Sequence, residues 1–146
     1  MARAEISTTI NRPVEEVFAV LSNLENNPKW SSAALEAKTI SAGPIGVGTR
    51  ARFVGKFLGR RIESESEITE FEPNRKLAFQ NMSGPFPFRG SLTVEAIEGE
   101  TRVNADFEAE PGGFFKLAEP LFMSMGRRQF ENDLANLKKL MEAHAL

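Results

Sequence analysis

The polar side chains that could meet a ligand are few, and they fall at alternating positions of strand-like segments. Ser64 and Ser66 share a phase with the apolar Ile68, and Asn81 shares one with Phe79. Because side chains alternate across a strand, these polar groups are expected on an otherwise apolar inward face. Hydroxyl and amide groups in such a setting orient a small apolar ligand by hydrogen bonding. The alternative is that the serines sit near a strand end and contact water.

Carboxylates are the other candidates for chemistry. Glu63, Glu65 and Glu67 resemble a catalytic cluster, but their phase places them on the solvent face, where arginines can pair with them. Asp133 lies beside the apolar stripe of the C-terminal segment. It could accept hydrogen bonds from a ligand or from sheet edges, although we expect it at a boundary between core and solvent.

Composition removes several kinds of catalytic site. The chain of 146 residues has no cysteine and no tyrosine, and its single histidine, His144, lies close to the C-terminal end. A Ser-His-Asp triad, a Cys-His pair and a histidine-based zinc or iron site therefore lack their residues. We predict no catalytic residue, no metal and no cofactor, and whether the protein is an enzyme stays open.

The charge pattern limits the kinds of partner that the protein is expected to bind. The net charge is -2 and no basic block stands out, so nucleic acid is not an expected partner. No uncharged stretch approaches the roughly 18 residues of a membrane span. The N-terminal segment carries Arg3 and Glu5 and has no apolar core, so it does not resemble a signal peptide, and a cytoplasmic location is expected.

These side chains must be positioned by a long C-terminal helix, predicted from Pro120 to about His144. Its apolar stripe follows helical spacing and comprises Phe122, Met123, Gly126, Phe130, Leu134, Leu137 and Met141. From Phe130 toward the C-terminus, the stripe is typical of a hydrophobic core. Toward the N-terminus, glycine inside a helix costs about 1 kcal/mol relative to alanine, so we interpret Gly126 as leaving space for a ligand. Pro120 is expected to kink the helix near the mouth of that space.

The rest of the chain predicts a sheet. A strand over 4–11 is followed by two short helices, and further strands are predicted over 34–40, 49–58, 60–71, 76–82, 89–97 and 101–110. Strands linked by hairpins form an antiparallel sheet with one dry face, which the long helix must cover. The inward phase of strand 49–58 is ambiguous, because Val54 is apolar on the phase opposite Phe53; Gly55 is expected to leave room beside Phe53.

The motifs, in this order, resemble those of one superfamily. They are residues 10–18 (INRPVEEVF), 23–30 (NLENNPKW), 46–50 (GVGTR), 68–79 (ITEFEPNRKLAF), 101–103 (TRV) and the C-terminal pattern over 133–142. The chain is similar to the START-like or birch-pollen-allergen-like (SRPBCC) superfamily, especially its bacterial polyketide cyclase/dehydrase-type branch. The resemblance implies an α+β helix-grip fold as a single domain over 1–146. A curved antiparallel sheet of about seven strands would wrap the C-terminal helix, with a hydrophobic cavity between them.

We predict that the ligand-binding residues line this cavity. They are Trp30, Phe53, Phe57, Ser64, Ser66, Phe79, Asn81, Phe86, Phe88, Met123, Met125, Gly126 and Phe130. Trp30, Phe86 and Phe88 are candidate lid residues, although Trp30 suits the core equally well. Methionine side chains adapt to varied apolar shapes, which suits a wall at Met123 and Met125.

Three functions remain open at this stage. The first is binding or carrying of a hydrophobic small molecule or lipid, by a monomer or homodimer. The second is a cyclase or dehydratase acting on an aromatic or polyketide substrate, and the third is a protein-interaction module of the co-chaperone or antitoxin-like kind. Members of the superfamily include lipid carriers, hormone receptors and cyclases, so the fold does not choose among them. The sequence leaves the ligand, the oligomeric state and the pathway undetermined.

Overall fold

The computed structural model describes residues 2–57, 59–84, 86–110 and 119–146, with the side chains of Ala2, Phe57 and Phe122 outside the description. The elements follow in the order β1 (Ala2–Ile10), α1 (Val14–Ser22), the 3-10 turn η1 (Leu24–Asn26), α2 (Asn27–Trp30), β2 (Ala34–Thr39), β3 (Arg50–Phe57), β4 (Arg60–Glu72), β5 (Lys76–Ser83), β6 (Phe88–Ile97), β7 (Glu100–Ala109) and α4 (Glu119–Glu142). Each predicted strand is present, with ends that differ by a residue or two.

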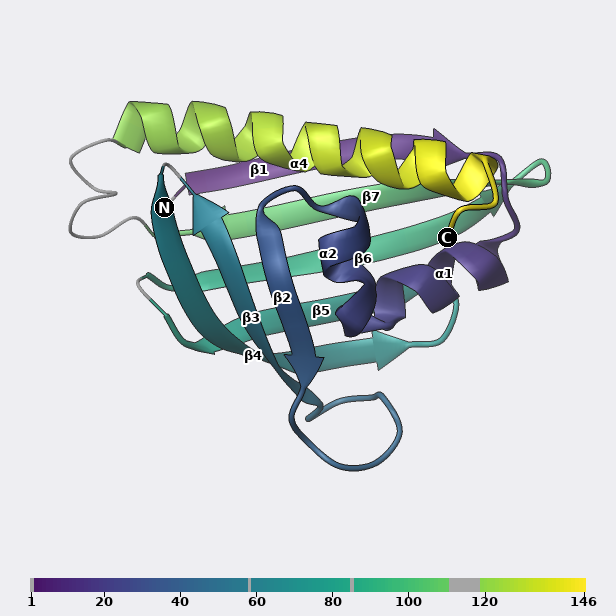
Figure 1. Ribbon diagram of the computed structural model, residues 1–146. Helices are drawn as coiled ribbons and strands as arrows, with labels where there is room; N and C mark the ends of the chain where they lie inside the picture. The colour runs from purple at the N-terminus through teal and green to yellow at the C-terminus, as the bar shows by residue number, and fades with distance from the viewer. Residues whose placement is uncertain (1, 58, 85, 111–118) are drawn as a thin grey trace.

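The strands form one antiparallel sheet in the order β1-β7-β6-β5-β4-β3-β2. Strand β1 therefore forms one edge of the sheet beside β7, whereas β2, the next strand in sequence, forms the opposite edge. Figure 1 shows the sheet curling so that β2, β3 and part of β4 rise across the ends of the other strands. Irregularities at Glu65/Ser66 and Ile68/Glu70 of β4 accompany this curl, and bulges bend a strand and increase its twist. The predicted helix-grip fold is confirmed.

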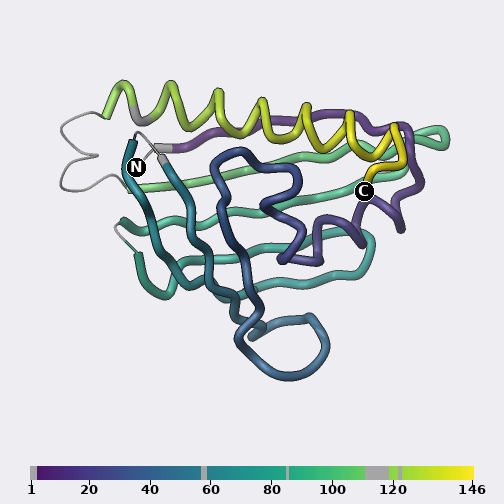
Figure 2. The backbone as a smooth tube through the Cα atoms, viewed as in Figure 1, coloured from purple at the N-terminus to yellow at the C-terminus, as the bar shows by residue number. Residues whose placement is uncertain are grey.

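Helix α4 lies along the sheet next to β1, as the backbone trace shows (Figure 2). Its C-terminal half carries the core residues Leu134, Leu137 and Met141, which are at most 3% exposed. Together with Ile10 and Val103 of the sheet they belong to one buried cluster. The prediction that this half of the helix stripe packs in the hydrophobic core is confirmed.

Polar contacts fix the C-terminal end of α4 to the end of β1 and the turn that follows it. The ammonium of Lys138 donates to the carbonyl of Thr9 at 2.6 Å, and Arg12 Nη1 donates to the carbonyl of Met141 at 3.0 Å. The backbone N–H of Asn11 donates to the Glu142 carboxylate at 2.8 Å. One end of the helix is thus held at the sheet edge, while its other end lies over the open side of the curl (Figure 1).

Two local expectations are wrong. Pro120 is the second residue of α4, where the first turn has no N–H partner to lose, so it begins the helix rather than kinking it. Gly55 does not make room for a ligand, because a Cβ there would lie 2.7 Å from the carbonyl oxygen of Ala33. That glycine instead allows the β2 segment to approach β3, where Lys56 N–H donates to the same oxygen at 2.8 Å.

Candidate ligand-binding site

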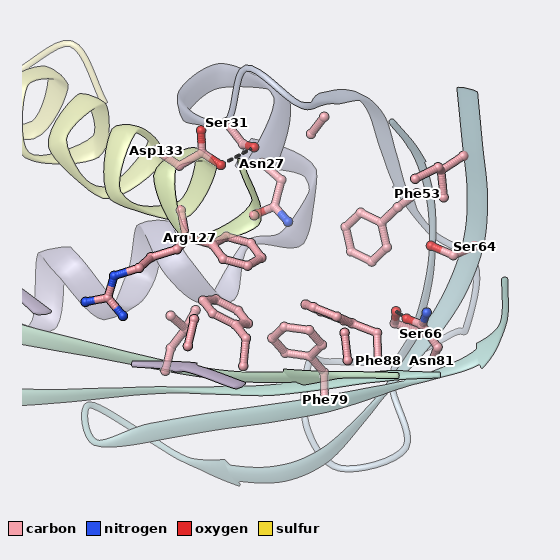
Figure 3. Close-up of a pocket in the computed structure, with 18 of the residues that line it drawn as sticks. Asn27, Ser31, Phe53, Ser64, Ser66, Phe79, Asn81, Phe88, Arg127 and Asp133 are labelled. Atoms are coloured by element: carbon pink, nitrogen blue, oxygen red, sulfur yellow. Dashed lines mark hydrogen bonds between the residues drawn. The ribbon is translucent and has the colours of Figure 1, made fainter. Parts of the chain in front are cut away.

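A cavity of about 670 Å³ lies between the sheet, α2 and the N-terminal half of α4 (Figure 3). Its apolar lining is drawn from almost every element: Leu21, Leu24, Trp30, Phe53, Ile62, Ile68, Leu77, Phe79, Phe86, Phe88, Leu92, Phe107, Met123, Phe130 and Leu134. Alternation along β3, β4 and β5 brings one face of each strand to this space, because the sheet is concave toward α4. A large apolar cleft with a few polar groups is the usual form of a small-molecule site.

Four phenylalanines form an aromatic wall that crosses the sheet and reaches α4. Phe107 and Phe130 stack with ring centroids 3.9 Å apart, Phe88 stacks on Phe107 at 5.7 Å, and Phe79 lies 6.0 Å from Phe88. Such offset and stacked pairs add to the stability gained from area burial. Phe88 is therefore part of this wall rather than a lid residue in an exposed loop.

A glycine in β6 makes this wall possible. A Cβ on Gly90 would lie 2.6 Å from Cδ1 of Phe107 and 3.0 Å from Cζ of Phe79. The first distance is shorter than real Cβ contacts and the second is tight, so glycine lets the two rings lie over the backbone of β6 without a shift of either ring. The sequence reasoning did not identify this position, although an isolated glycine within a strand pattern signals close approach of another group.

The first of two clusters of polar side chains in the cavity lies on the sheet. Ser66 Oγ donates to Oδ1 of Asn81 at 3.0 Å, and Asn81 Nδ2 donates to the carbonyl of Phe86 at 3.3 Å. Ser64, two residues before Ser66 and on the same face of β4, lines the same end of the cavity (Figure 3). The predicted polar set is thus brought together in one place, and it carries no net charge.

The second polar group lies opposite, where α2 meets α4. Asp133 is 4% exposed and its carboxylate accepts hydrogen bonds from Ser31 Oγ at 2.7 Å, the N–H of Ser32 at 3.3 Å and Gln129 Nε2 at 2.7 Å. Burial raises the pKa of Asp133, an effect that these three donors oppose. The expected boundary position is therefore wrong, because the segment after α2 folds over the helix and covers the carboxylate. Asn27, on the first turn of α2, projects into the cavity beside this pair (Figure 3).

Helix α4 supplies the remaining wall. Met123, Gly126 and Phe130 line the cavity, as predicted for the stripe. Met125 is outside the lining and 41% exposed, because it lies about 160° around the helix from both Met123 and Arg127, which line the cavity. The predicted role of Met125 in the wall is therefore not supported by its position.

The predicted acidic row lies on the outer face of the sheet. Arg52 Nη2 lies 2.9 Å from the carboxylate of Glu63, and Arg61 also pairs with it at 3.3 Å. The two guanidinium groups lower the pKa of Glu63 through hydrogen bonding and charge. Glu67 pairs with Arg50 at 3.4 Å, although part of this residue reaches the cavity next to the irregularity in β4. Ion pairing on an outer surface explains the row without a catalytic role.

Of the thirteen predicted ligand-binding residues, eleven line the cavity, Met125 does not, and the side chain of Phe57 lies outside the described part of the chain. That they contact a ligand stays a prediction. Asn27, Ser31 and Phe107 also line the cavity but were not among the predicted ligand-binding residues, and Asp133, weighed as an acceptor for a ligand, was expected at a boundary instead. Trp30 lines the cavity and packs on the core, and its indole Nε1 is buried with no hydrogen-bond partner in the described structure.

Comparison with known proteins identifies the family. A family model described as polyketide cyclase / dehydrase and lipid transport matches residues 1–142. The chain therefore belongs to this family, which confirms the resemblance to the START-like superfamily. A search of curated proteins finds no match.

Solved structures share the fold at low identity. The protein TTHA0849 of Thermus thermophilus has a TM-score of 0.85 at 20% identity, with 99% of each chain covered. The Zhui aromatase/cyclase of Streptomyces sp. R1128 gives 0.79 at 15% identity, covering 99% of this chain and 95% of that one. A START superfamily protein of Mycobacterium smegmatis gives 0.74 at 14% identity, covering 99% and 97%. At these identities the likeness shows the fold alone.

Within residues 2–57, 59–84, 86–110 and 119–146, no helix has the length and hydropathy needed to cross a membrane. In the same ranges, no group of three or more His, Cys, Asp or Glu side chains is placed to hold a metal ion.

Proposed function

We propose that this chain binds a hydrophobic small molecule or a lipid in the cavity between the sheet and α4. The observation that carries the proposal is a cavity of about 670 Å³ whose walls are mainly aromatic and aliphatic. A ligand that loses about 300 Å² of apolar surface there would gain about 7–8 kcal/mol. The cost of association takes part of this gain, so micromolar or tighter binding needs a larger buried area or hydrogen bonds at the polar side chains of the cavity.

The family description supports ligand binding and equally names cyclases and dehydrases. Catalysis is therefore a second candidate, and one observation favours it: a buried carboxylate, Asp133, lies at the cavity with its pKa raised. Such a group can take or give a proton in general acid–base catalysis. Under this alternative, Asp133→Asn would abolish turnover of a bound substrate and leave its affinity nearly unchanged.

Binding can be tested with a neutral fluorescent probe, N-phenyl-1-naphthylamine. Trp30 is the single tryptophan of the chain and it lines the cavity, so energy transfer from its indole reports a probe bound nearby. We expect saturable energy transfer with one probe per chain. Absence of saturable transfer would contradict the proposal. Met125→Leu, on the opposite side of α4, serves as a control that should leave the titration unchanged.

A further inference from the structure

We propose that the cavity selects apolar ligands whose head group donates a hydrogen bond, an alcohol or an amine, and discriminates against acids, with the head group held at Asn27 and Asp133. This inference rests on the proposed function, since it names the ligand class of the same cavity. It follows from the charges, the acceptors and the two polar groups that the described lining presents.

The buried ionisable side chain in the described lining is a carboxyl group, that of Asp133. Besides Asp133, the charged lining residues are Arg3, Glu67 and Arg127. Their side chains are 58%, 27% and 56% exposed, and each pairs with an oppositely charged side chain that does not line the cavity. Asp133 is 4% exposed and its partners are neutral. A second carboxylate brought beside it would meet repulsion in a poorly solvated place.

The free hydrogen-bonding capacity next to this charge suits a donor. Asp133 Oδ1 accepts from Ser32 and Gln129, whereas Oδ2 accepts only from Ser31 among the described residues. A carboxylate offers about four acceptor positions, so one on Oδ2 remains. The side-chain amide of Asn27 makes no hydrogen bond to the described residues and points into the cavity beside the Asp133–Ser31 pair (Figure 3).

The polar side chains on the sheet offer an acidic head group no better binding position. Ser64, Ser66 and Asn81 are neutral, and one hydroxyl and one amide among them already bond to each other. An anionic head group therefore finds no buried countercharge at either polar group of the described lining. A head group without a donor, such as an ether, could accept from the Asn27 N–H but would leave the Asp133 acceptor and the Asn27 amide oxygen without a partner. Sites of this kind reject analogues that lack the hydrogen-bonding group.

Four probes with ten-carbon chains separate these possibilities: 1-decanol, decylamine, decanoate and methyl decyl ether. Each is used below its micelle concentration at neutral pH to displace N-phenyl-1-naphthylamine from the intact chain. We expect decanol and decylamine to bind at least about tenfold more tightly than the ether and decanoate. A smaller preference, or none, overturns the inference and leaves the proposed function standing. If neither the fluorescent probe nor any decyl compound binds, it is the proposed function that fails.

Variants then test the assigned residues. Asp133→Asn keeps the shape of the side chain and removes its charge. The ratio of the decanoate Kd to the decanol Kd should therefore fall to less than about threefold, while the Kd of the ether stays the same. Glu108→Gln removes a carboxylate that pairs with Arg89 outside the cavity and should leave all four affinities unchanged. If circular dichroism shows that Asp133→Asn does not fold, Asn27→Leu decides instead. That variant should erase at least half of the logarithmic preference for decanol over the ether, and retention of the full preference in a folded variant overturns the assignment.

Discussion

Replacing Gly126 by leucine should stabilise the protein and weaken ligand binding together. Gly126 lies inside α4 and lines the cavity. A leucine side chain adds four carbon atoms, roughly 120 Å³ if each takes about the volume of a water molecule. That is under a fifth of the 670 Å³ cavity, so the cavity has volume enough to take the side chain.

The size of both effects can be estimated. Leucine is a better helix former than glycine by about 1 kcal/mol, and burying its side chain adds about 1.5–3 kcal/mol. A chain of this length should then melt about 5–15 °C higher. A ligand that used the same space would lose contacts equivalent to about four methylenes, which is about 3 kcal/mol or roughly a hundredfold in Kd.

The assays are differential scanning calorimetry without ligand and titration with N-phenyl-1-naphthylamine. Gly126→Ala is the matched control: it should supply the helix-propensity gain of about 1 kcal/mol and change Kd by no more than about fourfold. A Gly126→Leu protein with a higher Tm and an unchanged Kd would refute the reasoning about ligand placement. A lower Tm would show that the position has no room for a side chain.

Three further predictions concern the framework of the site. Gly90→Ala forces a Cβ against Phe107 and should destabilise the fold by about 1–3 kcal/mol, measured by urea unfolding, whereas a neutral result would mean that the aromatic wall adjusts freely. Leu137→Ala removes a fully buried side chain of the core and should cost about 2–5 kcal/mol, and a loss below about 1 kcal/mol would contradict the core assignment. Hydrogen bonds from Lys138 and a backbone N–H lower the pKa of Glu142, so its stabilising effect is present above the ordinary pKa of about 4.5 and is lost as the pH falls through the folded-state value. Glu142→Gln should therefore lower Tm at neutral pH, with the difference disappearing in acid; a difference that persists there would point to packing instead of charge.

Much of the fold follows from local pattern. Alternation in β4 and β5 correctly places Ser66 and Asn81 on the face that lines the cavity, because the period of two is set by the strand itself. Helical spacing places Gly126 and Phe130 on the lining side of α4 for the same local reason.

The rest of the site depends on contacts that no local pattern contains. Asp133 is buried only because the segment carrying Ser31 folds onto α4, some hundred positions away in sequence. Gly55 and Gly90 each accommodate a group from another segment of the chain, so the need for glycine at these positions becomes visible only when the neighbouring segments are known. Alternation also fails to predict that part of Glu67 reaches the cavity, next to an irregularity in β4 that shifts the register.

The most direct test of ligand binding is native mass spectrometry of the freshly purified chain. We expect a mass above that of the 16.2 kDa polypeptide under native conditions, returning to the polypeptide mass on denaturation, with the released molecule extractable into organic solvent. The extracted molecule should also rebind the delipidated chain and suppress energy transfer from Trp30 to N-phenyl-1-naphthylamine. A chain that carries no molecule, and that takes up neither the fluorescent probe nor any decyl compound after incubation, would contradict the proposal that this cavity binds apolar ligands.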